Sequence, residues 1–193
     1  MKPAATSKEE ILAACRELIH RQGGTALNVR EVAAACGISV GTVYNYFGSK
    51  ADLVGAAVES VWYDIFRCTD DGSAFATTQD CVRWLFGRLA YGNDQYPGFF
   101  TLHSASFVNQ DRPEGKVRMQ KAWEHIMEML CKVLQQDPLI RPGVFCDAFT
   151  PEQFADILFS LILAAQLRGQ YSADTVLQLV DRMLYQMPCS GTA

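Results

Sequence analysis

The stretch from Asn28 to Leu53, NVREVAAACGISVGTVYNYFGSKADL, decides the fold of the first part of this chain. Small and apolar side chains recur at helical spacing on both sides of a tight turn, Cys36-Gly37-Ile38-Ser39. Ser39 is a residue type that caps the start of a helix, and Gly48 is the type that follows a helix end, so we expect a short helix from Val40 to Phe47. Two short helices joined by a glycine-containing turn have the proportions of a helix-turn-helix.

The exposed side of the second short helix carries unusual residue types. Val43 and Phe47 are expected in the core, which leaves hydroxyl, amide and aromatic groups outside, where an ordinary solvated face carries Lys, Glu or Gln. These outer residues are Thr42, Tyr44, Asn45 and Tyr46. Such groups can bond phosphates and base edges, so we expect this face to bind DNA. Lys50 begins the next helix, where its cation opposes the helix dipole, and this placement favours a phosphate contact.

Helices are also predicted on both sides of this stretch. Ser7 and Glu10 form a capping box that starts a helix ending at Gly23-Gly24, and Asn28 with Glu31 predicts a second capping box. Further amphipathic stripes continue almost to the end of the chain, and we find no alternating strand pattern of useful length. The sequence therefore predicts an all-α protein with about nine helices.

Composition limits the class of protein. The chain has 193 residues, of which 49% are hydrophobic and 20% charged, and this mixture is typical of a globular fold. No run of 18 apolar residues is free of charge, and the first ten residues hold no apolar signal segment, so we expect a cytoplasmic protein without membrane contact. Seven scattered Cys form no C-x-x-C pair, which favours buried structural thiols and leaves a redox role open.

The sign of the charge changes along the chain. Residues 1–50 carry six Lys and Arg against four Glu, or +2, whereas the remaining residues carry 11 against 17, or −6. A mildly basic head on an acidic body indicates that a polyanion would contact the head. Enzyme signatures such as G-x-S-x-G, H-E-x-x-H or a glycine-rich phosphate loop do not occur, so we expect no enzyme, metal or cofactor. A helical adaptor that binds protein remains the alternative.

The stretch from Thr25 to Leu53 closely resembles the DNA-binding domain of tetracycline-repressor (TetR) family regulators, and the resemblance is specific over roughly residues 7–60. Departures are Cys36, Asn45 and Gly48. The resemblance implies a helix-turn-helix domain at residues 1–49, a connecting helix at 50–69, an effector-binding and dimerisation domain at 70–188 and a tail at 189–193. It implies a homodimer that binds a palindromic DNA operator and is released by a small-molecule effector.

The resemblance also assigns contacts in the head, carried over position by position. Those expected at phosphates are Arg30, Thr42, Asn45, Tyr46 and Lys50, and those expected to face bases are Val40, Gly41 and Tyr44. Because Val40 and Gly41 offer no side-chain hydrogen bond, we expect phosphate contacts and DNA shape to dominate affinity.

The expected dimer interface lies on the last two helices. The segment 151–168 is apolar nearly all round, which in a chain of this size favours pairing with a second copy in a four-helix bundle. The expected interface residues are Phe154, Ile157, Leu158, Leu161, Ile162, Ala165, Val176, Val180, Met183 and Leu184.

Bulky side chains between residues 62 and 130 are candidates for the effector site, because ligand pockets are mostly apolar with few polar anchors. The same pattern is also typical of ordinary core. The candidates are Trp62, Phe66, Trp84, Phe86, Tyr91, Phe99, Phe100, His103, Phe107, Trp123 and Met127. They favour an apolar or aromatic effector, whose identity the sequence does not give.

Overall fold

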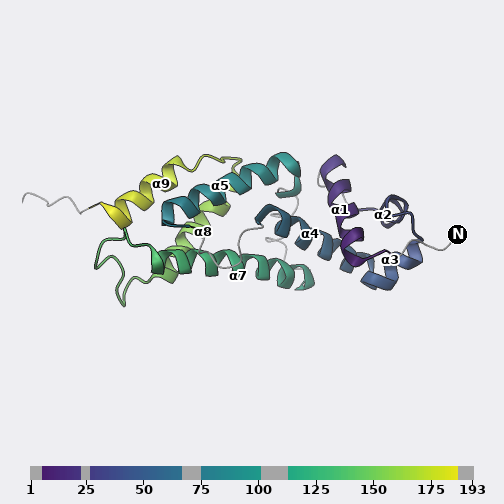
Figure 1. The fold of residues 1–193 in the computed structure, drawn as a ribbon, viewed down its shortest axis with the longest axis horizontal. Helices are drawn as coiled ribbons and strands as arrows, with labels where there is room; N and C mark the ends of the chain where they lie inside the picture. The colour runs from purple at the N-terminus through teal and green to yellow at the C-terminus, as the bar shows by residue number, and fades with distance from the viewer. Residues whose placement is uncertain (1–5, 23–26, 67–74, 101–112, 187–193) are drawn as a thin grey trace, which may run out of the picture. The chain divides into compact units, whose positions relative to one another are not determined.

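The described part of the protein is helical. The computed structural model describes residues 6–22, 27–66, 75–100 and 113–186, with side chains in the last range described from residue 123 onward. These ranges hold eight α-helices (Figure 1): α1 Lys8–Gln22, α2 Val29–Ala35, α3 Val40–Phe47, α4 Lys50–Phe66, α5 Thr78–Gln95, α7 Pro113–Gln136, α8 Pro151–Leu167 and α9 Asp174–Val180. Within them the only strand-like pairing is a single bridge between Cys146 and Phe149. The all-α prediction is confirmed.

Local signals in the sequence set most helix starts. Ser7 accepts from the Glu10 N–H at 3.1 Å while its own N–H donates to the Glu10 carboxylate at 2.7 Å, as expected of a capping box. Asn28 caps α2 by accepting from the N–H of Arg30. Glu31 was expected to accept a hydrogen bond from the Asn28 N–H in a capping box. Its carboxylate instead accepts from the Gln22 side chain of α1 at 3.1 Å.

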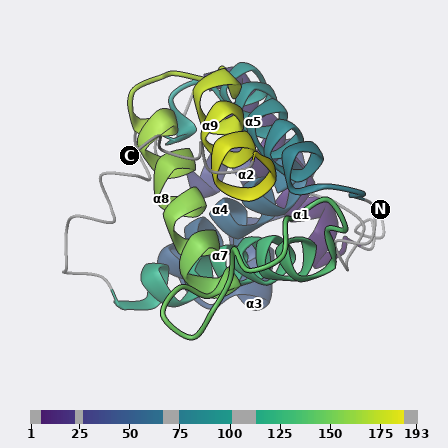
Figure 2. The same cartoon turned by 90° about the vertical axis from the view of Figure 1, so that its left-hand side faces the viewer.

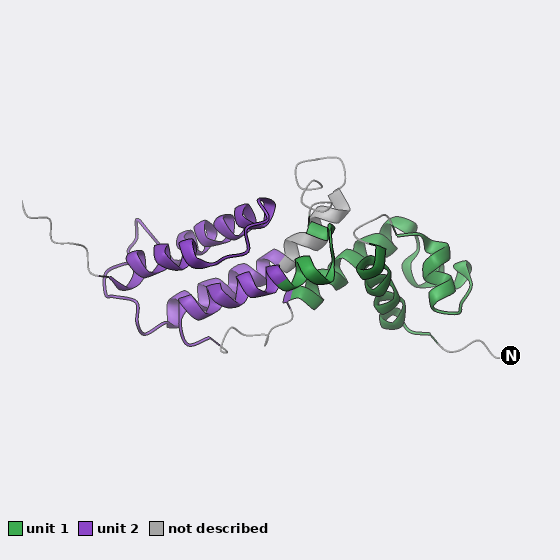
Figure 3. Cartoon of the chain, turned by 90° about the horizontal axis from the view of Figure 1, so that it is seen from above, with its two compact units in different colours: residues 1–65, 91–122 green, residues 66–90, 123–193 purple. Residues whose placement is uncertain are grey.

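Two compact units divide the chain (Figure 3). Unit 1 comprises residues 1–65 and 91–122, and unit 2 comprises residues 66–90 and 123–193. Helices α4, α5 and α7 cross the boundaries between the units, because each unit combines two segments that are distant in the sequence. The domain boundaries expected after residues 49 and 69 instead divide the chain into consecutive segments. Helix α4 is described as far as Phe66, and residues 67–69 of the expected connecting helix, like the proposed tail at 189–193, lie outside the described residues.

Unit 1 packs the head against α4 and the end of α5. Ile11 and Cys15 of α1 and Leu53 and Val61 of α4 are all fully buried within unit 1. Gly92 of α5 lies so close to its neighbours that an added Cβ would be 2.8 Å from Ile65 Cδ1 and 2.8 Å from Phe100 Cζ. A bare backbone at this point therefore allows α5 and α4 to approach closely.

Unit 2 contains a buried polar network around Asp137, which is 7% exposed at the end of α7. Its Oδ2 accepts from the Thr78 N–H at 2.7 Å, the Thr78 hydroxyl at 2.9 Å and the Tyr185 hydroxyl at 2.6 Å, and its Oδ1 accepts from the Leu139 N–H at 3.0 Å. Burial by itself raises the pKa of Asp137, but these hydrogen bonds outweigh it and hold the pKa below its usual value. The network joins the start of α5, the end of α7 and the last described turn.

The last helical segment of unit 2 changes its winding. Helix α9 continues directly into a five-residue π-helix, Asp181–Tyr185, and both Figures 1 and 2 show α9 alongside α5. Arg141 contacts the π-helix twice, since its N–H donates to the Leu184 carbonyl at 3.0 Å and its guanidinium to the Met183 carbonyl at 3.3 Å. Among the described residues, no helix is both long and apolar enough to cross a membrane.

Candidate nucleic-acid interface

The turn between α2 and α3 has the geometry of a helix-turn-helix. The N–H of Gly37 donates to the Ala34 carbonyl at 3.1 Å and that of Ile38 to the Ala33 carbonyl at 3.0 Å, which is the Schellman pattern of a helix end. Gly37 has φ +66°, a conformation that a residue with a Cβ adopts only at a cost. Ser39 then caps α3 by accepting from the Thr42 N–H at 3.0 Å. The predicted bounds of α3 are confirmed.

Helix α3 buries one face and exposes the other. Val43 and Phe47 are 0% and 5% exposed, so they anchor the helix in the core. By the helical period, Asn45 lies opposite this pair at the centre of the exposed face. Of the residues predicted to bind DNA, six are exposed and two are half-buried. The exposed ones are Arg30, Gly41, Tyr44, Asn45, Tyr46 and Lys50, and the half-buried ones are Val40 and Thr42.

Two contacts that sequence reasoning missed tie α3 to the start of the chain. The Tyr46 hydroxyl donates to the Thr6 carbonyl at 2.5 Å, and the Lys8 ammonium lies 5.5 Å from the centre of the Phe47 ring. A phosphate oxygen can only accept hydrogen bonds, so the Tyr46 proton reaches a phosphate only if the bond to Thr6 breaks. No local sequence pattern indicates these contacts, because they join residues about 40 positions apart in the chain.

The basic side chains of the head fall into two groups. Arg16 and Arg21 form ion pairs with Glu9 and Glu17, at 3.0 and 2.6 Å. Arg30 and Lys50 are both exposed, and within the described residues neither forms an ion pair. These two unneutralised cations flank the helix-turn-helix, because Arg30 lies near the start of α2 and Lys50 begins α4.

The position of Lys50 is fixed by a short connection between α3 and α4. Gly48 has φ +65° and directly follows α3, and Ser49 caps α4 by accepting from the Asp52 N–H at 3.1 Å. The Ser49 hydroxyl also donates to the Asp52 carboxylate at 2.7 Å. Only two residues thus separate α3 from α4, so Lys50 lies three positions after the end of α3.

The predicted effector residues are divided between the two units. In unit 1, Trp62 lies 6.0 Å from Phe99 and 5.5 Å from Phe100, measured between ring centres. In unit 2, Trp84 lies 6.4 Å from Phe66, and Trp123 contacts Phe159. Of the remaining candidates, Tyr91 belongs to unit 1 and Phe86 and Met127 belong to unit 2, whereas His103 and Phe107 lie outside the described residues.

Most of the predicted dimer residues belong to the core of a single chain. Those buried in this way are Phe154, Leu158, Ile162, Ala165, Val180 and Leu184, so their side chains have little surface left for a partner. Leu161 and Val176 are half-buried. Ile157 and Met183 remain exposed, at 43% and 38%. Two residues that were not predicted, Leu167 at 69% and Leu179 at 36%, add to this exposed apolar surface.

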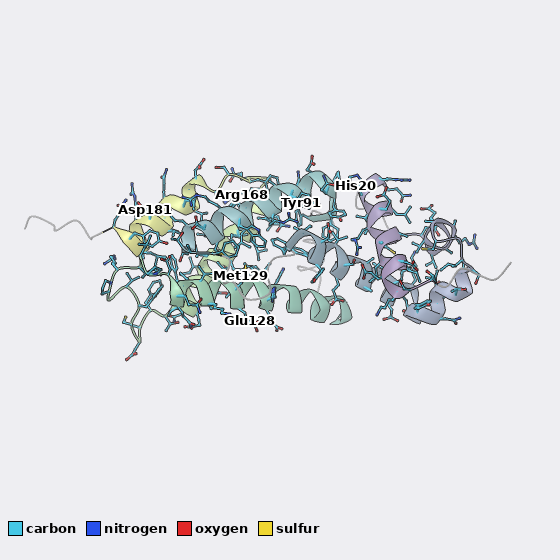
Figure 4. The ribbon with its side chains drawn as sticks, in the orientation of Figure 1. His20, Tyr91, Glu128, Met129, Arg168 and Asp181 are labelled. Atoms are coloured by element: carbon cyan, nitrogen blue, oxygen red, sulfur yellow. The ribbon has the colours of Figure 1, made fainter. Side chains whose placement is uncertain are left out.

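A polar junction joins α1 to the end of α5, and sequence reasoning missed it. The His20 ring (Figure 4) is hydrogen-bonded through Nδ1 to the Gln95 carbonyl and packs edge-on against Tyr96, with ring centres 6.4 Å apart. The Tyr96 hydroxyl donates to the Asp64 carboxylate at 2.8 Å. Burial and this bond raise the pKa of Tyr96, which keeps the phenol neutral. A contact between residues 75 positions apart leaves no local signal in the sequence.

The thiols with resolved shifts are held protonated. Burial raises the pKa of Cys15 to about 12 and also raises those of Cys36 and Cys131. Oxidant-sensing thiols have lowered pKa values, because the thiolate is the reactive form. These three residues therefore have the environment of structural cysteines.

Comparison with known proteins agrees with this geometry. Residues 11–57 match the family described as bacterial regulatory proteins, tetR family. The fold is similar to that of reduced NemR from E. coli, with 20% identity, a TM-score of 0.68, and 93% of this chain and 98% of that one covered. A TetR regulator from Haloarcula marismortui has 21% identity and a TM-score of 0.67, covering 91% and 95%. FadR from Bacillus subtilis, in complex with stearoyl-CoA, has 16% identity and a TM-score of 0.60, covering 94% and 100%. Residues 11–57 therefore form an N-terminal domain of the tetR family of bacterial regulatory proteins, and the helix-turn-helix of α2 and α3 is the DNA-binding element of that domain.

Proposed function

We propose that this protein is a repressor that binds a palindromic DNA operator as a homodimer and is released by a small apolar or aromatic effector. The observation that carries the proposal is the exposed face of α3, with Asn45 at its centre, together with the exposed cations of Arg30 in the first turn of α2 and Lys50 at the start of α4, which form no ion pair within the described residues. Cations that form no ion pair within the described part of the chain are available to DNA phosphates, and phosphate contacts supply most of the affinity of DNA-binding proteins.

The proposed division of labour in the head follows from side-chain chemistry. Arg30, Thr42 and Lys50 are assigned to phosphates, and Tyr44 with the adjoining Val40 and Gly41 to base edges and thymine methyl groups. Asn45 was expected at a phosphate, and its amide can equally bond a base edge from the centre of the face. Tyr46 acts chiefly by holding Thr6 beside α3.

The test is selection of bound duplexes from a random DNA pool at about 100 mM salt. We expect the wild-type protein to recover a palindrome and a Tyr44→Ala/Lys50→Ala variant to recover none. The matched control is Tyr63→Phe/Lys132→Ala, which alters an exposed tyrosine of α4 and a lysine of α7 and should select the wild-type site. Recovery of nothing above background by the wild type would contradict the proposal.

Salt dependence separates this function from the alternative, a helical adaptor that binds protein. Affinity for DNA should fall steeply as salt rises, because each neutralised phosphate releases counterions. Binding through an apolar surface should change little over the same range. An affinity for the selected duplex that does not vary between about 50 and 200 mM salt would contradict phosphate-dominated binding.

The homodimer is proposed to form through the exposed apolar side chains of α8 and α9. Ile157, Leu167, Leu179 and Met183 are the most exposed of these, and a second copy would cover them. Ile157→Glu should give a monomer in analytical ultracentrifugation at micromolar concentration, because it places a charge in the interface. The control Leu139→Glu alters a leucine that is 62% exposed outside both helices and should leave the dimer intact. A monomeric wild type would refute the arrangement.

Release by effector is proposed to act through α5. This helix begins in unit 2 and ends in unit 1, where Gln95 and Tyr96 contact His20 and Asp64. An effector that shifts the position of α5 would therefore alter the support of α1 and the spacing of the two recognition helices, which must stay about 34–36 Å apart or a multiple of that. Tyr96→Phe removes only the hydrogen bond to Asp64. Although residue 96 is not among the proposed DNA contacts, this substitution should change operator affinity.

A further inference from the structure

Gln166 is the buried polar side chain of α8, and it is 6% exposed. Its Oε1 atom is buried and has no hydrogen-bond partner within the described structure. A buried acceptor without a partner is unfavourable, and such groups in folded proteins are rare enough to call for a specific reason. The reason we consider is a hydrogen bond to a molecule that is not part of this chain.

The direction of Gln166 separates it from the dimer surface. By the helical period, Gln166 lies on the side of α8 opposite Ile157 and Ala164, which belong to the more exposed side. It shares its side with the buried residues Phe159 and Ile162. A second copy packed on the exposed surface of α8 would therefore not reach the Gln166 amide, so a bonding partner would have to lie on the buried side of this helix.

A buried aromatic ring, Phe159, lies on the same side of α8. Phe159 packs edge-on against Trp123 of α7, with ring centres 5.4 Å apart. Phe159 precedes Gln166 by seven residues, or about 10 Å along the helix axis. An aromatic surface at one end and a single acceptor at the other match the general form of a ligand site, in which apolar contacts give affinity and one polar group fixes orientation.

We propose that Gln166 is the polar anchor of the effector site, and that the effector is a neutral aromatic molecule carrying one hydroxyl or N–H donor. This inference rests on the proposed ligand-responsive function and narrows its effector class. The aromatic body lies against Trp123 and Phe159, and the donor bonds Gln166 Oε1. A molecule that offers only acceptors at that end leaves the amide oxygen unpaired, so the site discriminates against it.

The test compares two probes that differ in one donor, 1-naphthol and 1-methoxynaphthalene. Each is titrated into the purified full-length protein without DNA, and binding is measured by calorimetry. We expect 1-naphthol to bind about tenfold more tightly or better, because its hydroxyl pairs a buried acceptor. Equal affinity for the two probes, tighter binding of the methyl ether, or no binding of either would overturn the proposal.

Two variants keep the test specific. Gln166→Met retains the length of the side chain and removes the acceptor, so the preference for 1-naphthol should disappear while binding of 1-methoxynaphthalene stays or improves. Gln136→Met, at an exposed glutamine near the end of α7, should behave as wild type. A preference that persists in Gln166→Met would overturn the assignment, and a cooperative thermal transition confirms that each variant is folded.

Failure of this inference is distinguishable from failure of the proposed function. Operator binding by gel shift reports on the head, and the calorimetric experiment contains no DNA. If the wild type binds its selected operator but does not distinguish the two probes, the DNA-binding function stands and the Gln166 assignment is wrong. If it distinguishes the probes but binds no operator, the ligand site stands and the repressor function is wrong.

Discussion

Removing the carboxylate of Asp137 tests how unit 2 is held together. In Asp137→Ala, four hydrogen bonds to a charged acceptor are lost, and the Thr78 and Tyr185 hydroxyls lose their partner in a site where Asp137 is 7% exposed. Bonds to charged groups contribute about 1.5–3 kcal/mol each, but water can replace part of the loss at the surface-facing side. We expect the free energy of unfolding to fall by about 3–5 kcal/mol.

Smaller changes in the same network set an order of effects. Tyr185→Phe removes one bond and should cost about 1–2 kcal/mol. Thr78→Val removes the hydroxyl but keeps the backbone N–H bond, so it should cost about 1–1.5 kcal/mol. Urea unfolding followed by circular dichroism gives these values, measured at one fixed protein concentration because the proposed dimer would contribute to stability. A loss below about 1 kcal/mol for Asp137→Ala would refute the reasoning.

The same variant gives a pH test with a defined sign. The pKa of Asp137 is lowered in the folded protein, so the ionised carboxylate stabilises the fold above the pKa of the unfolded chain. That stabilisation is lost as the pH falls below about 4, through the folded value. The difference in stability between wild type and Asp137→Ala should therefore shrink as the pH falls below about 4. A difference that stays constant from neutral pH to about pH 3 would contradict the assigned charge.

Three further substitutions test the head. Lys50→Ala should weaken operator binding and lower the slope of log affinity against log salt by about 1 per half-site, whereas Lys132→Ala should leave both unchanged in fluorescence anisotropy. Gly37→Ala should destabilise the protein by about 1–2 kcal/mol in urea unfolding because its φ is positive, whereas Gly87→Ala in the open middle of α5 should stabilise it by about 0.5–1 kcal/mol. Tyr46→Phe should lose about 1 kcal/mol of stability while keeping its sequence preference in duplex selection; an altered preference would assign its hydroxyl to the DNA.

Local signals allowed much of the head to be predicted. The bounds of α3 followed from Ser39 and Gly48, because caps and helix ends are set by residues within one turn. The exposed polar face followed from the positions of Val43 and Phe47 in the helical period. The match to the tetR family over residues 11–57 agrees with these predictions.

Contacts between distant parts of the chain could not be predicted in this way. The Tyr46 hydroxyl bonds Thr6, and His20 contacts Gln95, through approaches that only the folded chain creates. The dimer prediction illustrates the same limit. The apolar character of α8 on several sides indicated that its side chains would be buried. It did not indicate which of them a single chain buries, such as Leu158, and which it leaves exposed, such as Ile157.

The contact between Tyr46 and Thr6 has a practical consequence for anyone who purifies this protein. An affinity tag fused before Met1 is separated by only five residues from Thr6, whose carbonyl accepts a hydrogen bond from Tyr46 of α3. A flexible polyhistidine segment there adds titratable imidazoles next to the surface proposed to meet phosphates, and below about pH 6.5 those imidazoles become cations that attract any DNA. A tag fused after Ala193 leaves the Thr6 contact unchanged, so the DNA sequence specificity that is measured is that of the protein without a contribution from the tag.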